Sequence, residues 1–290
     1  MKLITPFDPW KSKLCSCPQK YSLSPYTGCS HGCLYCYASS YIKNFYPSRP
    51  KKNFLKQLEK EIKKLPSSSY ITIANSSDPY PPQEEKLRLT RATLEILKRE
   101  EEKLDLRLML VTKSSLILKD LDILKEFKHI VVSISITTLD EKLAKMLEPY
   151  AASVYKRLDA LRKLSKYLPV VCRVDPLIYP LNTENLEIIV KKIKECGAKQ
   201  IITSTYKVRP DNFQRMVKRF PQYRKLWQDL YMKKGEKISG YIYLPLELRK
   251  KLISRLREIC LKEGLEFSSC REGLTQLNTT ICDGSAFFND

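Results

Sequence analysis

The sequence contains no hydrophobic run that approaches the roughly 20 residues of a membrane-spanning helix. Its first ten residues lack the apolar core of a secretory signal. It also shows neither internal repeats nor low-complexity tracts. These absences exclude a helical membrane protein, and we expect a cytoplasmic protein with no membrane partner.

Acidic residues are scarce. The chain has 32 Asp and Glu against 52 Lys and Arg, which gives a formal net charge of +20. Such an excess attracts polyanions, and nucleic acid, DNA or RNA, is the obvious one. Lysine-rich and glutamate-rich surfaces also occur in proteins from hot environments, but that usage alone would be closer to balanced. We therefore expect a nucleic acid partner.

Cysteines, in contrast, are numerous and clustered. Ten cysteines in a cytosolic chain indicate metal ligands or reactive thiols rather than disulfides. Cys29, Cys33 and Cys36 have the spacing C-x3-C-x2-C in a loop with two glycines. Three thiolates on one short loop can bind one metal centre, as cysteines bind iron–sulfur clusters. Three ligands on a four-iron cluster leave one iron open, so the loop predicts a cluster that binds and activates another molecule.

Other readings of the cysteines remain open. A zinc site at the loop would use His31, one of only two histidines, as a fourth ligand. Cys15 and Cys17 near one end and Cys270 and Cys282 near the other could form a second metal site, or they could be ordinary reduced thiols. The three cysteines expected in the core are Cys172, Cys196 and Cys260.

The apolar pattern predicts an α/β fold. Hydrophobic residues make up 43% of the 290 residues, enough for a sizeable core. Continuous apolar, β-branched runs alternate with amphipathic stretches, which indicates a parallel sheet buried on both faces. Six β/α units suit a barrel or open barrel. The expected strands are 21–27, 70–74, 107–111, 129–136, 169–174 and 199–205, and the expected helices are 53–65, 84–101, 115–127, 140–147, 153–167, 183–196 and 245–264.

We divide the chain into an N-terminal arm at 1–23, a barrel at 24–207 and a C-terminal, largely helical extension at 208–290 packed on the barrel. Polar residues follow five of the expected strands, and in barrel folds chemistry lies where strands end. These residues should therefore face the same mouth as the cysteine loop. They are 75–78, 112–114, 133–138, 173–176 and 204–207.

The loop at 24–38 resembles the signature of the radical S-adenosylmethionine (SAM) superfamily, including the aromatic Tyr35 before the last cysteine. Within it, the chain resembles the spore photoproduct lyase-like, or "DNA repair photolyase", branch. The resemblance covers about residues 24–180 in matching order and spacing. Its further segments are 78–84, 89–91, 111–114, 133–140, 147–149 and 173–177.

This resemblance implies a partial (β/α)6 TIM-like barrel and a [4Fe-4S] cluster held by Cys29, Cys33 and Cys36. SAM would chelate the open iron, and one electron from the cluster would cleave it to methionine and a 5′-deoxyadenosyl radical that abstracts hydrogen from the substrate. The electron would come from a donor such as ferredoxin or flavodoxin.

The resemblance also suggests SAM contacts. Tyr35 would pack near the cluster and the adenine. The methionine amino group would meet the segment after the second strand, and the ribose would meet the fourth strand. Lys113 and Arg173 could pair with the carboxylate, since a guanidinium suits two oxygens, or they could be structural ion-pair members. The remaining candidates are Ser76, Ser77 and Asp78 for the amino group, and Ser133 and Ser135 for the ribose.

One departure limits the expected reaction. True spore photoproduct lyases use a cysteine downstream of the loop as hydrogen donor, but no cysteine lies between Cys36 and Cys172 here. We therefore predict no particular catalytic residue and do not expect photoproduct repair by that mechanism. The substrate is expected to be a nucleic acid, with a basic, aromatic stretch at 206–231 as a candidate contact. The alternatives are a radical SAM enzyme acting on a small molecule or peptide, and a non-catalytic metal-containing nucleic-acid-binding module.

Overall fold

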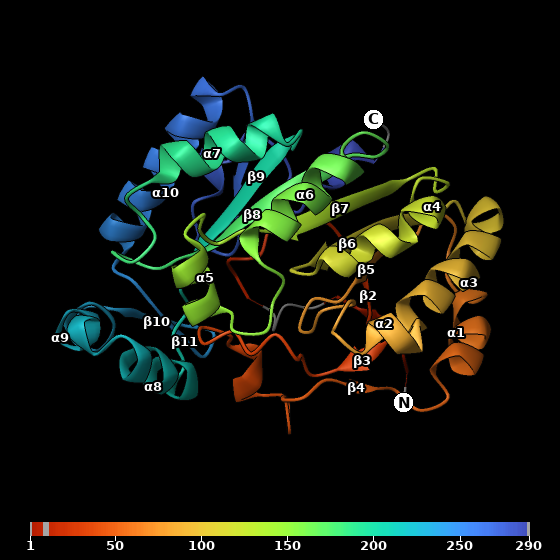
Figure 1. The fold of residues 1–290 in the computed structure, drawn as a ribbon, viewed down its shortest axis with the longest axis horizontal. Coiled ribbons are helices and arrows are strands. Elements are labelled where there is room, and N and C mark those ends of the chain that lie inside the picture. The colour runs from red at the N-terminus through yellow and green to blue at the C-terminus, as the bar shows by residue number, and fades with distance from the viewer. Residues whose placement is uncertain (1, 8–11, 289–290) are drawn as a thin grey trace.

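A computed structural model describes residues 2–7 and 12–288. Eight of the described strands form one sheet in the order β1-β2-β5-β6-β7-β8-β9-β12 (Figure 1). All neighbours in it are parallel except β1 (Thr5–Pro6), which runs antiparallel to β2. The parallel strands are β2 (Tyr21–Leu23), β5 (Tyr70–Ile73), β6 (Arg107–Thr112), β7 (Ile130–Ser135), β8 (Val170–Leu177), β9 (Gln200–Thr205) and β12 (Glu266–Ser269).

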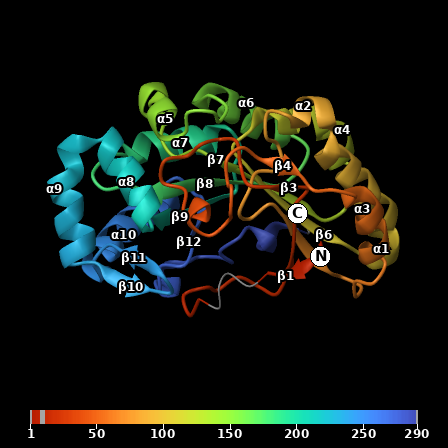
Figure 2. The same ribbon diagram turned by 90° about the horizontal axis from the view of Figure 1, so that it is seen from below.

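The helices cover the outer face of this sheet, while N-terminal and C-terminal segments cross its inner face (Figure 2). Each residue of β5, β7 and β9 is buried, as a strand covered on both faces requires. The helices are α1 (Phe54–Ile62), α2 (Glu84–Leu87), α3 (Leu89–Leu104), α4 (Leu121–Leu124), α5 (Glu141–Leu147), α6 (Val154–Leu164), α7 (Leu186–Glu195), α8 (Pro210–Arg219), α9 (Arg224–Trp227) and α10 (Leu246–Lys262). No helix among the described residues has the length and apolarity to span a bilayer.

Short elements complete the fold. Two small antiparallel pairs are β3 (Tyr26–Thr27) with β4 (Arg49–Pro50), and β10 (Glu236–Ile238) with β11 (Tyr241–Tyr243). A π-helical turn covers Gln228–Lys233, and 3-10 turns cover Ala38–Ser40, Ser115–Asp120, Pro221–Tyr223, Thr275–Leu277 and Ser285–Phe287.

The inner face of the sheet changes character along the strands. At one end it carries a small apolar cluster that includes Met109, Val131 and Val171, closed by Phe288 from the C-terminal segment. Near the carboxyl ends the facing residues are polar. Ser135 of β7 pairs in register with Arg173 of β8, and β8 becomes irregular after Val174. The apolar cluster therefore closes one end of the sheet and leaves the polar end available for a site.

The structure confirms the predicted α/β barrel with its mostly parallel sheet and corrects three elements. The first strand ends at Leu23 because Pro25 has no N–H for the ladder, and Tyr26–Thr27 pairs with β4 instead. The helix expected at 115–127 is a 3-10 turn followed by the short α4.

The third correction concerns the sheet edge, where β12 adds a seventh parallel strand that the sequence pattern did not reveal. The segment 208–290, proposed as an extension, thus supplies both α10 and a sheet strand. The proposed arm at 1–23 includes residues 1 and 8–11, which lie outside the described residues.

Candidate active site

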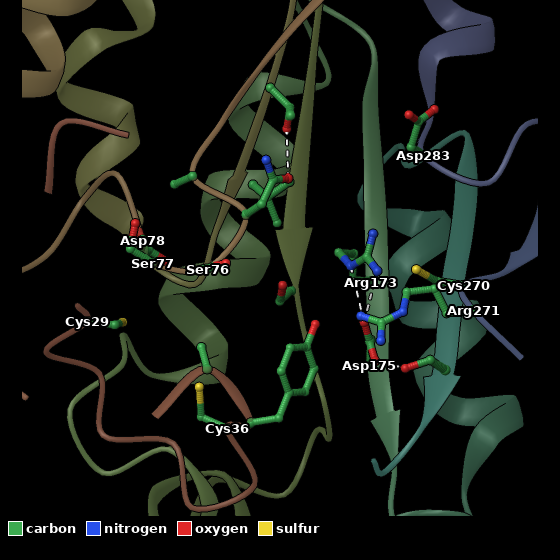
Figure 3. Close-up of a pocket in the computed structure, with 18 of the residues that line it drawn as sticks. Cys29, Cys36, Ser76, Ser77, Asp78, Arg173, Asp175, Cys270, Arg271 and Asp283 are labelled. Atoms are coloured by element: carbon green, nitrogen blue, oxygen red, sulfur yellow. Dashed lines mark hydrogen bonds and ion pairs between the residues drawn. The ribbon is translucent and has the colours of Figure 1, made fainter. Parts of the chain in front are cut away.

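A cavity of about 420 Å³ opens at the carboxyl ends of the parallel strands (Figure 3). Its walls come from the N-terminal arm, the cysteine loop, the strand ends and the C-terminal segment after β12. Because parallel strands end at one edge, polar residues far apart in sequence meet there. Those on the walls include Asn75, Ser76, Ser77, Asp78, Thr112, Lys113, Ser135, Arg173, Asp175, Ser204, Thr205 and Lys207.

The loop that carries Cys29, Cys33 and Cys36 forms one wall of this cavity. The backbone N–H of Cys29 donates to the Phe45 carbonyl at 3.0 Å, and the N–H of Leu34 donates to the Leu147 carbonyl at 2.9 Å. The loop is thus fixed to the segment that follows it and to the end of α5.

Two glycines allow the loop to follow this path. Gly28 and Gly32 have φ values of +76° and +68°, in the left-handed region that glycine tolerates. A Cβ at Gly28 would lie 2.1 Å from the Phe45 carbonyl oxygen, and one at Gly32 would lie 2.8 Å from the ring of Tyr150. Both positions therefore require glycine.

His31, inside the C-x3-C interval, binds Asp78 rather than facing the cavity as a free ligand. Its Nε2 lies 3.0 Å from Asp78 Oδ2, and its Nδ1 lies 3.4 Å from the carbonyl oxygen of Tyr150. Asp78 also accepts from the Thr112 hydroxyl at 2.6 Å and from the backbone N–H of Lys113 at 2.8 Å. Asp78 thus connects the cysteine loop to the ends of β5 and β6.

Tyr35, which lies between Cys33 and Cys36 in the chain, belongs to a buried polar network. Its hydroxyl donates to Glu148, which also accepts from the Thr137 hydroxyl at 2.7 Å and pairs with Arg157 at 2.6 Å. Burial alone would raise the pKa of Glu148, but the charges of Arg157 and Lys113 and the two hydroxyls lower it to about 2. Glu148 is therefore a carboxylate at neutral pH and fixes the Tyr35 ring within the cysteine loop.

The wall opposite the loop carries an ion pair. Arg173 Nη2 lies 2.9 Å from Asp175 Oδ2, and the hydroxyl of Ser204 donates to the same carboxyl group at 2.5 Å. Deeper in the wall, Lys207 pairs with Glu272 at 2.8 Å. The sequence predicted that Asp175 and Lys207 face this mouth but gave neither a specific contact, and it did not single out Glu272.

A sequence profile of the radical SAM superfamily matches residues 23–193, more than half of the chain. The chain belongs to the radical SAM superfamily. Its curated relatives are "Uncharacterized protein MJ0683" of Methanocaldococcus jannaschii, 35% identical over 147 residues, and "Uncharacterized protein ORF301" of Acidianus two-tailed virus, 31% identical over 195 residues. The matches cover 50% and 60% of this chain, and the chain spans only 55% and 63% of those relatives.

Solved structures share the fold of this superfamily member. A spore photoproduct lyase variant with bound SAM and a dinucleoside spore photoproduct aligns with a TM-score of 0.68 at 19% identity, over 89% of this chain and 79% of that one. Streptococcus suis SuiB bound to SAM aligns with a TM-score of 0.55 at 16% identity, over 86% of this chain and 49% of that one. The predicted partial radical SAM barrel and the resemblance to spore photoproduct lyase are confirmed at the level of the fold.

The family's [4Fe-4S] cluster and SAM fit the donors present. Burial raises the pKa of all three loop thiols, and the charge of Asp78 adds to this effect at Cys29. Metal binding must therefore release protons from these thiols. Among the described residues, no three His, Cys, Asp or Glu side chains are placed to hold a single metal ion. A cluster would bind each thiolate through a different iron and therefore does not require three sulfurs around one ion.

The predicted SAM contacts differ in accessibility. Tyr35, Ser76, Ser77, Lys113, Ser135 and Arg173 line the cavity, as does Asp78. Ser133 lies two residues deeper in β7, is completely buried and does not line it. The aromatic residues Phe220, Trp227 and Tyr231 of the basic stretch are buried in the core and are closed to base stacking.

Proposed function

We propose that the protein is a radical SAM enzyme in which Cys29, Cys33 and Cys36 hold a [4Fe-4S] cluster. The supporting observation is that the three cysteines share one cavity with the polar strand ends. When bound and reduced, the cluster supplies the electron that splits SAM into methionine and a 5′-deoxyadenosyl radical, which abstracts hydrogen from the substrate.

The chain's own residues position SAM. Ser76 and Ser77 offer hydroxyls to its amino group, and Ser135 offers one to the ribose. Lys113 is the better placed cation for the carboxylate, because its ammonium makes only a long contact of 3.9 Å with Glu148, whereas Arg173 is already paired with Asp175. Asp78 is engaged with His31 and Thr112, so we assign it to holding the loop rather than to binding SAM directly. Ser133 is completely buried and does not line the cavity, so we assign it no contact with SAM.

We propose a nucleic acid as the substrate. The net charge of +20 supports this, and the spore photoproduct lyase that shares the fold was solved with a dinucleoside lesion. The ten free cysteines favour a reducing compartment, and we place the protein in the cytoplasm with a ferredoxin or flavodoxin as electron donor.

Deuterium transfer tests the substrate class. Reduced protein is incubated with SAM and with deuterated DNA, RNA or metabolite fractions, and the 5′-deoxyadenosine formed is analysed by mass spectrometry. Deuterium from a nucleic acid fraction supports the proposal. Deuterium from the metabolite fraction alone would instead establish the small-molecule alternative. A deuterated peptide fraction is tested in the same way, and deuterium from that fraction alone would establish the peptide alternative.

Binding provides a second test. Affinity for nucleic acid should fall steeply as salt increases, because Lys and Arg contacts release counterions from the phosphates. Absent or salt-independent binding, with the cluster confirmed spectroscopically, would contradict the nucleic acid assignment.

A further inference from the structure

Four cysteines outside the family loop line the same cavity. Cys15 and Cys17 come from the N-terminal arm, Cys270 directly follows β12, and Cys282 lies in the C-terminal segment. The Sγ atoms of Cys17 and Cys282 are 3.5 Å apart, although they belong to opposite ends of the sequence. The fold therefore gathers thiols that the sequence separates widely.

Cys15 and Cys270 complete this group. The thiol of Cys15 contacts that of Cys17, and Cys270 is near enough for its charge to affect both Cys15 and Cys282. The sheet fixes two members, since the N–H of Cys270 donates to the Thr203 carbonyl at 2.7 Å and the Ser268 hydroxyl donates to the Cys282 carbonyl at 3.3 Å.

We propose that Cys15, Cys17, Cys270 and Cys282 hold a second iron–sulfur cluster, on the wall of the cavity opposite the family loop. Figure 3 shows Cys29 and Cys36 on one side and Cys270 beside Arg173 on the other. A centre at this place faces the space between the loop and the strand ends. It requires nothing from the proposed SAM chemistry, because its ligands are separate residues.

Two cations lie close to the thiols, Lys20 near Cys17 and Arg173 near Cys270. Lys20 is buried, forms an ion pair with Asp283 at 2.5 Å, and is close enough to act on Cys17. The positive charge of Lys20 and Arg173 offsets part of the negative charge that thiolate ligands carry. The thiolate is the form that binds metal.

Simpler explanations account for fewer of these observations. A disulfide between Cys17 and Cys282 would leave Cys15 and Cys270 unexplained. Cys260 is an example of an ordinary core thiol. It is fully buried, and burial alone raises its pKa, with no contribution from another cysteine. Two sulfurs on one tetrahedral metal atom lie about 3.8 Å apart at bonds of about 2.3 Å, so the 3.5 Å separation of Cys17 and Cys282 suits two ligands of the same iron. Among the described residues no three ligating side chains are placed for one ion, which favours a two-iron cluster with two thiolates on each iron over a single ion.

Iron analysis of the full chain tests the proposal. After anaerobic reconstitution with iron and sulfide, the wild type should hold about six irons, C29A/C33A/C36A about two and C17A/C282A about four. C260A, the matched control, should equal the wild type. The proposal is overturned if C29A/C33A/C36A holds no iron, if C17A/C282A retains the wild-type amount, or if zinc occupies the site.

Spectroscopy separates the two centres. In the reduced wild type, electron paramagnetic resonance should show two signals, of which SAM perturbs only the one lost in C29A/C33A/C36A. The SAM-insensitive signal should disappear in C17A/C282A. One signal in the wild type, or a Cys17–Cys282 disulfide in anaerobically prepared protein, would contradict a second cluster.

A folding control keeps these results interpretable. Circular dichroism should show that C17A/C282A is folded. If it is not, C270A is substituted, which retains the Cys17–Cys282 pair and should still lose the second signal. Native mass spectrometry of the wild type gives an independent readout, the mass of two clusters. The mass of one cluster would overturn the proposal.

Discussion

His31 Nε2 lies 3.0 Å from Asp78 Oδ2, and this contact joins the cysteine loop to the end of β5. Both side chains are buried, with 3% and 7% of their surface exposed. Burial alone would raise the pKa of Asp78, but His31 and the Thr112 hydroxyl lower it and keep the carboxylate charged. The spacing of Cys29 and Cys33 is therefore supported by a residue between them that binds protein rather than metal.

Removing His31 should weaken the loop cluster. In H31N the reconstituted protein should lose iron from the loop site to a chelator about 10-fold to 100-fold more readily, as expected when a residue that orients the ligands is lost. The control is H129N. His129 Nε2 lies 3.3 Å from Asp105 Oδ1, and this pair is not part of the cysteine loop. Equal iron retention in H31N and wild type would show that the contact does not support the cluster.

The Glu148–Arg157 pair should contribute strongly to stability. E148Q leaves Arg157 buried without its partner, so the free energy of unfolding should fall by about 3–5 kcal/mol. Denaturant titration of the cluster-free protein measures this change. E85Q, which removes an exposed partner of Lys119, should leave the unfolding free energy unchanged. A loss in E85Q as large as in E148Q would refute the assignment.

The same carboxyl group predicts a pH dependence. Its pKa is lowered from 4.5 to about 2 in the folded chain, so the folded state is favoured while the group is ionised. The stabilisation is complete above about pH 4.5 and is lost as pH falls toward 2. The difference in unfolding free energy between wild type and E148Q should shrink through this interval. If the difference in unfolding free energy stayed constant from pH 7 to pH 3, the lowered pKa of Glu148 would be contradicted.

Lys113 should matter for SAM affinity. K113M should raise the Kd for SAM about 10-fold to 100-fold, because a hydrogen bond to a charged group is worth about 1.5–3 kcal/mol. Calorimetric titration of the reconstituted protein measures Kd, and iron content should stay at the wild-type level. K119M is the control, since Lys119 pairs with the exposed Glu85. An unchanged Kd in K113M would assign the carboxylate to another residue.

Much of this arrangement follows from local sequence. The continuous β-branched runs specify buried parallel strands, and their order determines which polar residues meet at the strand ends. The C-x3-C-x2-C spacing marks the loop before any contact is known. Long-range packing was less accessible. β12 has only four residues, three of them polar, and without it Cys270 and Arg271 have no place beside the cavity.

The burial of charged residues on helices was also not predictable from the sequence. Arg157 of α6 has the pattern of a solvated helix position, yet it is 1% exposed because it pairs with Glu148 and donates to the Ser135 carbonyl at 3.0 Å. Helical periodicity distinguishes apolar from polar faces but does not reveal a buried ion pair.

Reductive cleavage of SAM tests the central claim most directly. Wild-type protein with a spectroscopically confirmed loop cluster, reduced by dithionite, should convert SAM to 5′-deoxyadenosine and methionine, quantified by liquid chromatography. C29A/C33A/C36A should form neither product. An intact, reduced loop cluster that binds SAM but yields no 5′-deoxyadenosine would contradict the account.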